Sequence, residues 1–136
     1  MDSFAKLAAD ERRAYLEETA NRRNSTNTAI EKDFWVCWTL RHLFSLQGMP
    51  PMCFKGGTSL SKVFRLIHRF SEDIDVSLDR AALGFIGKRD LANEDLSNTK
   101  RKQLDTQLRE AIQNEVTTTI LPRMTESFAS VIGKTG

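Results

Sequence analysis

The sequence predicts an α+β domain, with helices packed on a small mixed sheet resembling a nucleotidyltransferase core. Two observations support this fold class. Apolar residues recur with the helical period over long stretches near both ends of the chain, and with a period of two over residues 73–78. The length of 136 residues suits a single domain, and a hydrophobic content of 40% is enough for a modest core without disulfides.

We divide the chain into three segments by pattern. Residues 1–27 are expected to form an N-terminal helix, over residues 3–19, and a polar connector over residues 21–27. Residues 28–80 contain the core motifs, and residues 81–136 contain a loop and a C-terminal helical segment.

A second helix is predicted from Thr28 to about residue 46. The Thr28 hydroxyl and the Glu31 carboxylate have the spacing of a capping box. The helix is apolar on most sides, so it should be buried, lying across the sheet. Its lone histidine, His42, is better interpreted as a packed or exposed residue than as a metal ligand, because no second ligand follows one turn later. Cys37 and Cys53 are expected to be packed thiols rather than a disulfide or a metal pair.

The central stretch combines a glycine turn, a helix and an acidic strand. A short buried strand over residues 52–54 precedes Gly56 and Gly57, which permit a sharp reversal. The next helix is predicted to have an apolar face and a basic face, the latter containing Lys62, Arg65 and Arg69. In the strand that follows, alternation places Ile74, Val76 and Leu78 on one face and Asp73, Asp75, Ser77 and Asp79 on the other.

These features together predict a site for a nucleoside triphosphate. Carboxylates two residues apart on a strand lie about 6–7 Å apart at the backbone, so Asp73 and Asp75 can converge on one hard cation. Mg²⁺ is commonly held by one or two carboxylates together with substrate phosphates. The glycine turn opens a helix whose free N–H groups favour anions, and the hydroxyls of Thr58 and Ser59 add further donors.

The same residues resemble a known family. The run KGGTSLSK, then RFSEDIDVS, preceded by IEKDFWVCWTLRHLF, is similar to the AbiEii nucleotidyltransferase toxins of bacterial type IV toxin–antitoxin systems, within the DNA polymerase β-type superfamily. The resemblance covers about residues 30–78. Glu31, Lys32 and Asp33 match the E-K-D of that family, and we assign them a structural role in preference to direct catalysis.

The resemblance implies metal-dependent transfer of a nucleotide from an NTP to an RNA acceptor such as tRNA. It further implies a toxin that acts in a toxin–antitoxin or phage-defence system and has a cognate antitoxin as a partner. Separately, the lack of an apolar run long enough for a membrane span and of a signal-peptide core predicts a cytoplasmic protein. Asp73 and Asp75 would be the catalytic residues and would hold Mg²⁺. The residues expected to bind the nucleotide are Gly56, Gly57, Thr58, Ser59, Lys62 and Arg69.

The C-terminal part is less informative. A loop over residues 81–99 is expected to be anchored by Phe85 and Ile86, and a helix capped by Ser97, Asn98 or Thr99 should end at Pro122. The downstream carboxylates do not fall in an alternating strand, so no third catalytic acid is found. We therefore expect an incomplete catalytic set, weak transfer by the chain alone, and an apolar sheet edge covered by a second copy or by further protein.

The composition and the absence of certain motifs exclude some classes of function but do not select one. The net charge of +2 permits a nucleic-acid partner but does not demand one, and no apolar run reaches the roughly 18 residues that a membrane span needs. A P-loop is excluded because the G-K-[ST] ending is missing. The alternative function is an inactive nucleotide-binding module, or a module that binds an antitoxin or self-associates.

The glycine turn yields a first prediction. Gly57→Val should weaken triphosphate binding more than Ser61→Ala, because a branched side chain blocks the approach of a phosphate to the backbone and disfavours positive φ. Calorimetric titration of each folded variant with NTP and Mg²⁺ measures the difference. Full NTP affinity in a folded Gly57→Val variant would assign the glycines to packing alone.

Overall fold

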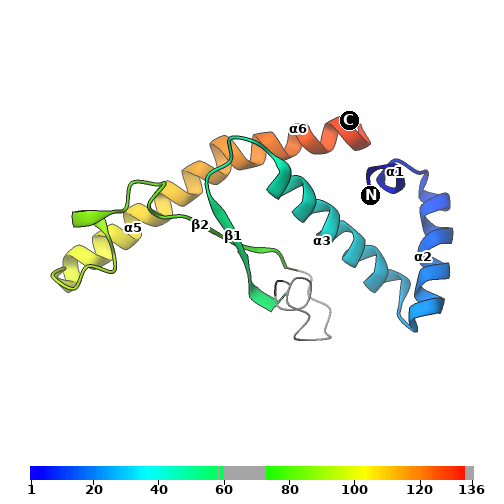
Figure 1. The fold of residues 1–136 in the computed structure, drawn as a ribbon, viewed down its shortest axis with the longest axis horizontal. Helices are drawn as coiled ribbons and strands as arrows, with labels where there is room; N and C mark the ends of the chain where they lie inside the picture. The colour runs from blue at the N-terminus through cyan, green and yellow to red at the C-terminus, as the bar shows by residue number, and fades with distance from the viewer. Residues whose placement is uncertain (58, 60–72, 134–136) are drawn as a thin grey trace.

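The computed structural model describes residues 1–57, 59 and 73–133, and it confirms the α+β class (Figure 1). In Figure 1, α5 and α6 form one long rod, the two strands lie near the middle of the molecule, and α2 and α3 form an antiparallel pair at one end. None of the helices in the described ranges is long and apolar enough to cross a membrane. The elements are α1 (Asp2–Ala5), α2 (Ala9–Arg23), α3 (Asn27–Ser45), β1 (Met52–Lys55), β2 (Asp75–Leu78), the 3-10 helix η1 (Gly87–Arg89), α5 (Asn98–Glu115), the π-helical η2 (Val116–Ile120) and α6 (Leu121–Ile132).

The single N-terminal helix predicted over residues 3–19 is wrong, because the chain forms α1 and α2 with a break between them. Ala8 is extended, with φ −60° and ψ 153°. The Arg12 guanidinium donates hydrogen bonds to the carbonyl of Leu7 at 2.5 Å and to that of Ala5 at 3.4 Å. These bonds satisfy carbonyls that a continuous helix would have paired internally, so the break leaves them partnered.

The start of α3 also differs from the prediction. Thr26, not Thr28, is the N-cap, and its hydroxyl accepts a hydrogen bond from the Ala29 N–H at 3.2 Å. The capping box of Thr28 and Glu31 is therefore wrong, and the connector shrinks because α2 continues to Arg23. Asn24 ends α2 in the left-handed region, at φ 50°, which a short polar side chain tolerates.

The described core is centred on Trp38 of α3, which is only 2% exposed. Its ring lies 4.3 Å from the ring of His42 and 4.6 Å from that of Phe128 in α6. The indole N–H donates to the Asp2 carboxylate at 2.8 Å, and His42 Nδ1 lies 2.7 Å from the Ser127 hydroxyl. This cluster joins α1, α3 and α6, so α3 packs between α2 and α6 rather than across the sheet. His42 is packed, which is one of the two alternatives predicted for it.

The predicted helix end at Pro122 is wrong, because the helical rod continues through η2 into α6. Proline has no N–H and its ring crowds the carbonyl four residues earlier, so an ordinary α-helix would be disrupted there. The π turn of η2 changes the hydrogen-bond register directly before Pro122, which then occupies the first turn of α6. The hydroxyls of Thr117 and Thr118 donate to the carbonyls of Gln113 and Asn114, at 2.9 and 2.8 Å respectively.

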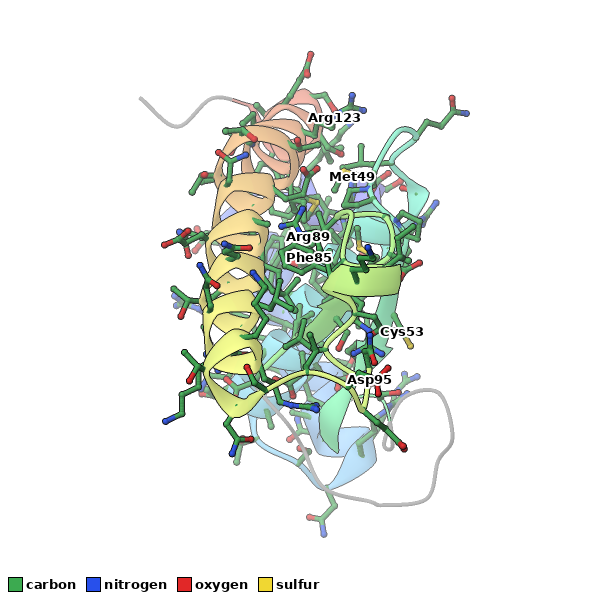
Figure 2. The ribbon with its side chains drawn as sticks, turned by 90° about the vertical axis from the view of Figure 1, so that its left-hand side faces the viewer. Met49, Cys53, Phe85, Arg89, Asp95 and Arg123 are labelled. Atoms are coloured by element: carbon green, nitrogen blue, oxygen red, sulfur yellow. The ribbon has the colours of Figure 1, made fainter. Side chains whose placement is uncertain are left out.

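The segment between β2 and α5 is held in place by the buried Phe85 ring and the Arg89 guanidinium. Phe85 is 2% exposed, and the Arg89 guanidinium lies 4.4 Å from its ring centroid. Figure 2 shows Phe85 and Arg89 on the inner side of the segment, between α5 and the strands. The predicted anchor Ile86 is 61% exposed, so only Phe85 acts as one. Ser97 caps α5, as one of the predicted alternatives, by accepting from the Lys100 N–H at 3.3 Å.

The Asp2 contacts generate a prediction on stability. Hydrogen bonds from Trp38 and then His42 lower the pKa of the Asp2 carboxyl below its usual range. Since the pKa is lowered in the folded state, the carboxylate stabilises the fold above its unfolded-state pKa, and this contribution is lost as the pH falls through the folded-state pKa. Asp2→Ala should therefore lower the melting temperature at neutral pH.

The matched control is Glu110→Ala, which removes an exposed carboxylate from the middle of α5. Thermal unfolding followed by circular dichroism should show a larger loss for Asp2→Ala, and the gap between the variants should narrow in strong acid. An equal loss for both variants at neutral pH would contradict the role of Asp2 in joining α1 to α3.

Candidate functional site

The candidate site lies on one face of the β1–β2 ladder. The strands are antiparallel, with the pairs Met52↔Leu78, Cys53↔Ser77, Phe54↔Val76 and Lys55↔Asp75. Directly opposed residues leave a sheet on the same face, so one face carries Cys53, Lys55, Asp75 and Ser77. The opposite face carries Met52, Phe54, Val76 and Leu78. The alternation predicted for β2 is confirmed, and the described part of the predicted sheet is this one antiparallel pair.

The strand limits differ slightly from the prediction. β1 continues to Lys55, and β2 begins at Asp75 rather than at Asp73. Asp73 therefore precedes the strand, and both acidic residues are exposed. Asp79 follows the strand, where its backbone N–H donates to the Pro51 carbonyl at 2.8 Å and its carboxylate accepts from the Ala81 N–H at 2.9 Å. The Asp79 carboxylate thus stabilises the turn after β2.

The structure brings the glycine turn and the acidic strand into direct contact. Gly56 has φ 75°, a left-handed conformation that glycine adopts without steric cost. A Cβ placed on Gly56 would lie 2.8 Å from the Asp75 carboxyl carbon and 3.0 Å from its Cβ, and would overlap one carboxylate oxygen. Only glycine leaves room for the Asp75 side chain at this position. Two motifs separated by 18 residues in the sequence therefore meet at one corner of the ladder.

The remaining predicted site residues fall into two groups. Gly57 is half-buried, and the positive φ expected there is wrong, because Gly56 is the glycine of this turn that has a positive φ. Ser59 is 5% exposed, so most of the residue is enclosed by protein. The other predicted residues lie outside the described residues, and so does the basic helical face expected after the glycine turn. They are Thr58, Lys62, Arg65 and Arg69.

Two of the downstream carboxylates form ion pairs with arginines. Asp90 lies 3.4 Å from the Arg80 guanidinium, and Asp105 lies 2.8 Å from that of Arg109. Across residues 1–57, 59 and 73–133, no group of three or more histidine, cysteine, aspartate or glutamate side chains could hold a metal ion. Asp73 and Asp75 therefore belong to no such group among the described residues, and their role as metal ligands stays a prediction.

Sequence reasoning missed that Cys53 and Lys55 share a face with Asp75. Cys53 is exposed, so its predicted packing in a buried strand is wrong, although both cysteines are free as predicted. Figure 2 shows the Cys53 sulfur pointing away from α5. Cys37 is half-buried, and burial raises the pKa of its thiol. Extending the period of two by one residue beyond the predicted strand would have placed Lys55 on the Asp75 face.

One comparison with known proteins gives a match. Residues 38–134, more than two thirds of the chain, match the family described as Nucleotidyl transferase AbiEii toxin, Type IV TA system. No curated protein and no solved structure matches the chain. The matched range contains the ladder, the glycine turn and the α5–α6 rod, so the similarity extends well beyond Leu78, where the resemblance predicted from sequence ended.

The Gly56 contact predicts a specific loss of stability. Gly87 is the matched control, because it has φ 57° and nothing within 4 Å of an added Cβ. Gly87→Ala should cost about 1–2 kcal/mol from left-handed strain alone. Gly56→Ala should cost more, because the methyl group also displaces the Asp75 carboxylate.

Urea unfolding of both variants measures the two costs. Combining Gly56→Ala with Asp75→Ala should recover part of the additional loss, since the clash with the carboxylate is removed and only the Cβ contact at 3.0 Å remains. Equal costs for Gly56→Ala and Gly87→Ala, with no recovery in the double variant, would show that the Gly56–Asp75 contact does not constrain the site.

Proposed function

Since this chain belongs to the AbiEii family of nucleotidyl transferase toxins of type IV toxin–antitoxin systems, we propose that it transfers a nucleotide from an NTP to an RNA acceptor hydroxyl, for example on tRNA, with Mg²⁺. The observation that supports this proposal best is the contact between Asp75 and Gly56. It places a carboxylate capable of metal binding beside the turn proposed to bind phosphate.

The donor set suits Mg²⁺. This ion prefers hard oxygen ligands and is usually held by one or two carboxylates, with substrate phosphates and water completing its octahedron. Asp75 is the first residue of β2 and Asp73 lies two residues before it, and both are exposed, so both can bind a cation from the solvent side. When bound, Mg²⁺ would offset the charge of the triphosphate and lower the pKa of the acceptor hydroxyl.

We assign phosphate binding to the turn that follows β1. Gly56 and Gly57 carry no side chain that would keep a phosphate from their backbone. Thr58 and Ser59 complete the proposed cradle, and Lys62 and Arg69 would neutralise charge that develops on the departing phosphates. The buried position of Ser59 suits a role in holding the turn in shape while its neighbours bind the substrate.

The reaction would be an in-line displacement at the α-phosphorus. The acceptor oxygen forms a bond to this phosphorus, the bond to the oxygen that bridges the α- and β-phosphates breaks, and pyrophosphate leaves. The proton of the acceptor hydroxyl passes to solvent. Asp73 and Asp75 would orient the triphosphate through the cation, and the glycine turn would hold the departing phosphates in line.

In the cell, we propose that this transfer inactivates RNA in the cytoplasm, where NTPs and tRNA are abundant. The chain would then act as the toxin of a toxin–antitoxin pair, with a cognate antitoxin limiting the damage, and such a system would serve in phage defence.

A second candidate, a module for protein association, is favoured by exposed apolar side chains. Ile86, Leu121 and Ile132 are 61%, 58% and 45% exposed, and burial of apolar surface favours association. Association with a second copy or with an antitoxin would cover part of this surface. Such binding should persist in a chelator, whereas a live nucleotide site needs Mg²⁺.

The acidic pair provides the test of the proposed function. Asp73→Asn and Asp75→Asn should each abolish Mg²⁺-dependent NTP binding while leaving the fold intact, because both side chains face solvent. Asp95→Asn, at another exposed aspartate, is the matched control and should bind as the wild type does. Calorimetric titration with NTP in Mg²⁺ and in chelator gives the affinities.

The parallel assay uses labelled NTPs and total tRNA. Transfer of label that is lost in both site variants and kept in Asp95→Asn would support the enzymatic proposal. Unchanged NTP affinity in both site variants would refute the assignment of Asp73 and Asp75 as metal ligands.

A further inference from the structure

The ladder places an unassigned cation at the candidate site. Lys55 is the last residue of β1 and is the direct cross-strand partner of Asp75. Residues opposed in this way have Cβ atoms about 4.5–5.5 Å apart and point to the same face. Lys55 also immediately precedes Gly56, whose backbone contacts the Asp75 carboxylate. The Lys55 ammonium therefore belongs to the same corner of the sheet as the proposed metal ligand and the proposed phosphate turn.

The backbone of Lys55 is held in place, whereas its ammonium group can move. The ladder holds its backbone in register, and the left-handed Gly56 redirects the chain directly after it. The side chain is exposed, so a flexible four-carbon stem can carry the ammonium toward Asp75 or toward an anion above the turn.

On this basis we propose that Lys55 binds the triphosphate of the substrate, as the cationic side chain between the glycine turn and the metal-binding carboxylates. The inference rests on the proposed function and adds a specific residue to it. A triphosphate that approaches Asp75 meets a carboxylate of like charge, so a cation that can reach the space beside that carboxylate reduces the repulsion. Lysine acts as a compact point charge toward phosphate and needs no defined fork geometry.

An ordinary cross-strand ion pair with Asp75 is the competing role for Lys55. Such a pair would stabilise the ladder slightly and would have no direct effect on nucleotide affinity. The two roles differ in their effect on NTP affinity, and in neither does Lys55 help to bind the metal. A positive charge near the metal site weakens the binding of free Mg²⁺ through like-charge repulsion. Removal of the Lys55 ammonium should therefore not reduce Mg²⁺ affinity. The same removal should reduce NTP affinity if Lys55 contacts phosphate.

The test compares Lys55→Met and Lys55→Arg with Lys88→Met. Lys88 is an exposed lysine of η1, so this control removes one positive charge elsewhere on the surface. Calorimetry with each of the four common NTPs in Mg²⁺ gives the affinities, the matching nucleosides test for a phosphate contact, and Mg²⁺ alone tests the metal site. Thermal unfolding of each variant checks the fold.

For Lys55→Met we expect NTP affinity to fall roughly 10- to 100-fold, as for loss of a hydrogen bond to a charged group. Nucleoside affinity and free Mg²⁺ affinity should not fall, Lys55→Arg should retain most NTP binding, and Lys88→Met should match the wild type. Equal NTP affinities for Lys55→Met and Lys88→Met, with Mg²⁺-dependent binding by the wild type, would overturn the role of Lys55 and leave the proposed function standing. A parallel fall in NTP and Mg²⁺ affinity with a lower melting temperature would also overturn it. Absence of Mg²⁺-dependent NTP binding in the wild type would overturn both.

Discussion

The packing of Trp38 against Phe128 and His42 is the interaction on which the arrangement of the chain depends. It brings the C-terminal helix α6 onto α3, and the Asp2 carboxylate adds α1 to the same cluster. Burial of a large aromatic ring with its N–H partnered is among the most stabilising events available to a small domain. Because α3 leads directly into β1, fixing α3 on α6 also fixes where the ladder begins.

A hydrogen bond from α6 connects this cluster to the start of the ladder. The Arg123 guanidinium of α6 donates to the Gln47 carbonyl at 2.6 Å, in the short turn between α3 and β1. Gly48 follows with φ 69°, and the nearest atom to an added Cβ there is a nitrogen of Arg123 at 3.0 Å. The entry to β1 is thus held by the same helix that packs on Trp38. The ladder is therefore anchored at both connections: this turn holds the entry to β1, and the buried Phe85 holds the segment that leaves β2.

The site depends on a constraint of space rather than on a strong bond. Gly56 must be glycine for two separate reasons, its left-handed φ and the proximity of Asp75. Substitution therefore affects backbone strain and carboxylate position together. Lys55 and Asp75 also share one face by register, so a slip of one residue would send one of them to the apolar side. The requirement for glycine at position 56 and the strand register together fix the positions of Lys55 and Asp75, although the ladder is short and the core is small.

Local pattern by itself determined much of this protein. Alternation in residues 73–78 fixed the two faces of β2, the apolar stripes fixed α3 as a long helix, and the glycine and acidic motifs identified the family that residues 38–134 match. These features depend on period and on local turn chemistry, which neighbouring residues encode. Tertiary structure decided the rest. The break before α2 depends on the Arg12 guanidinium, and the passage of the rod through Pro122 depends on a π turn. The nearness of Lys55, Gly56 and Asp75 depends on strand register, because pairing between segments 18 or more residues apart is set by contacts that no local pattern contains.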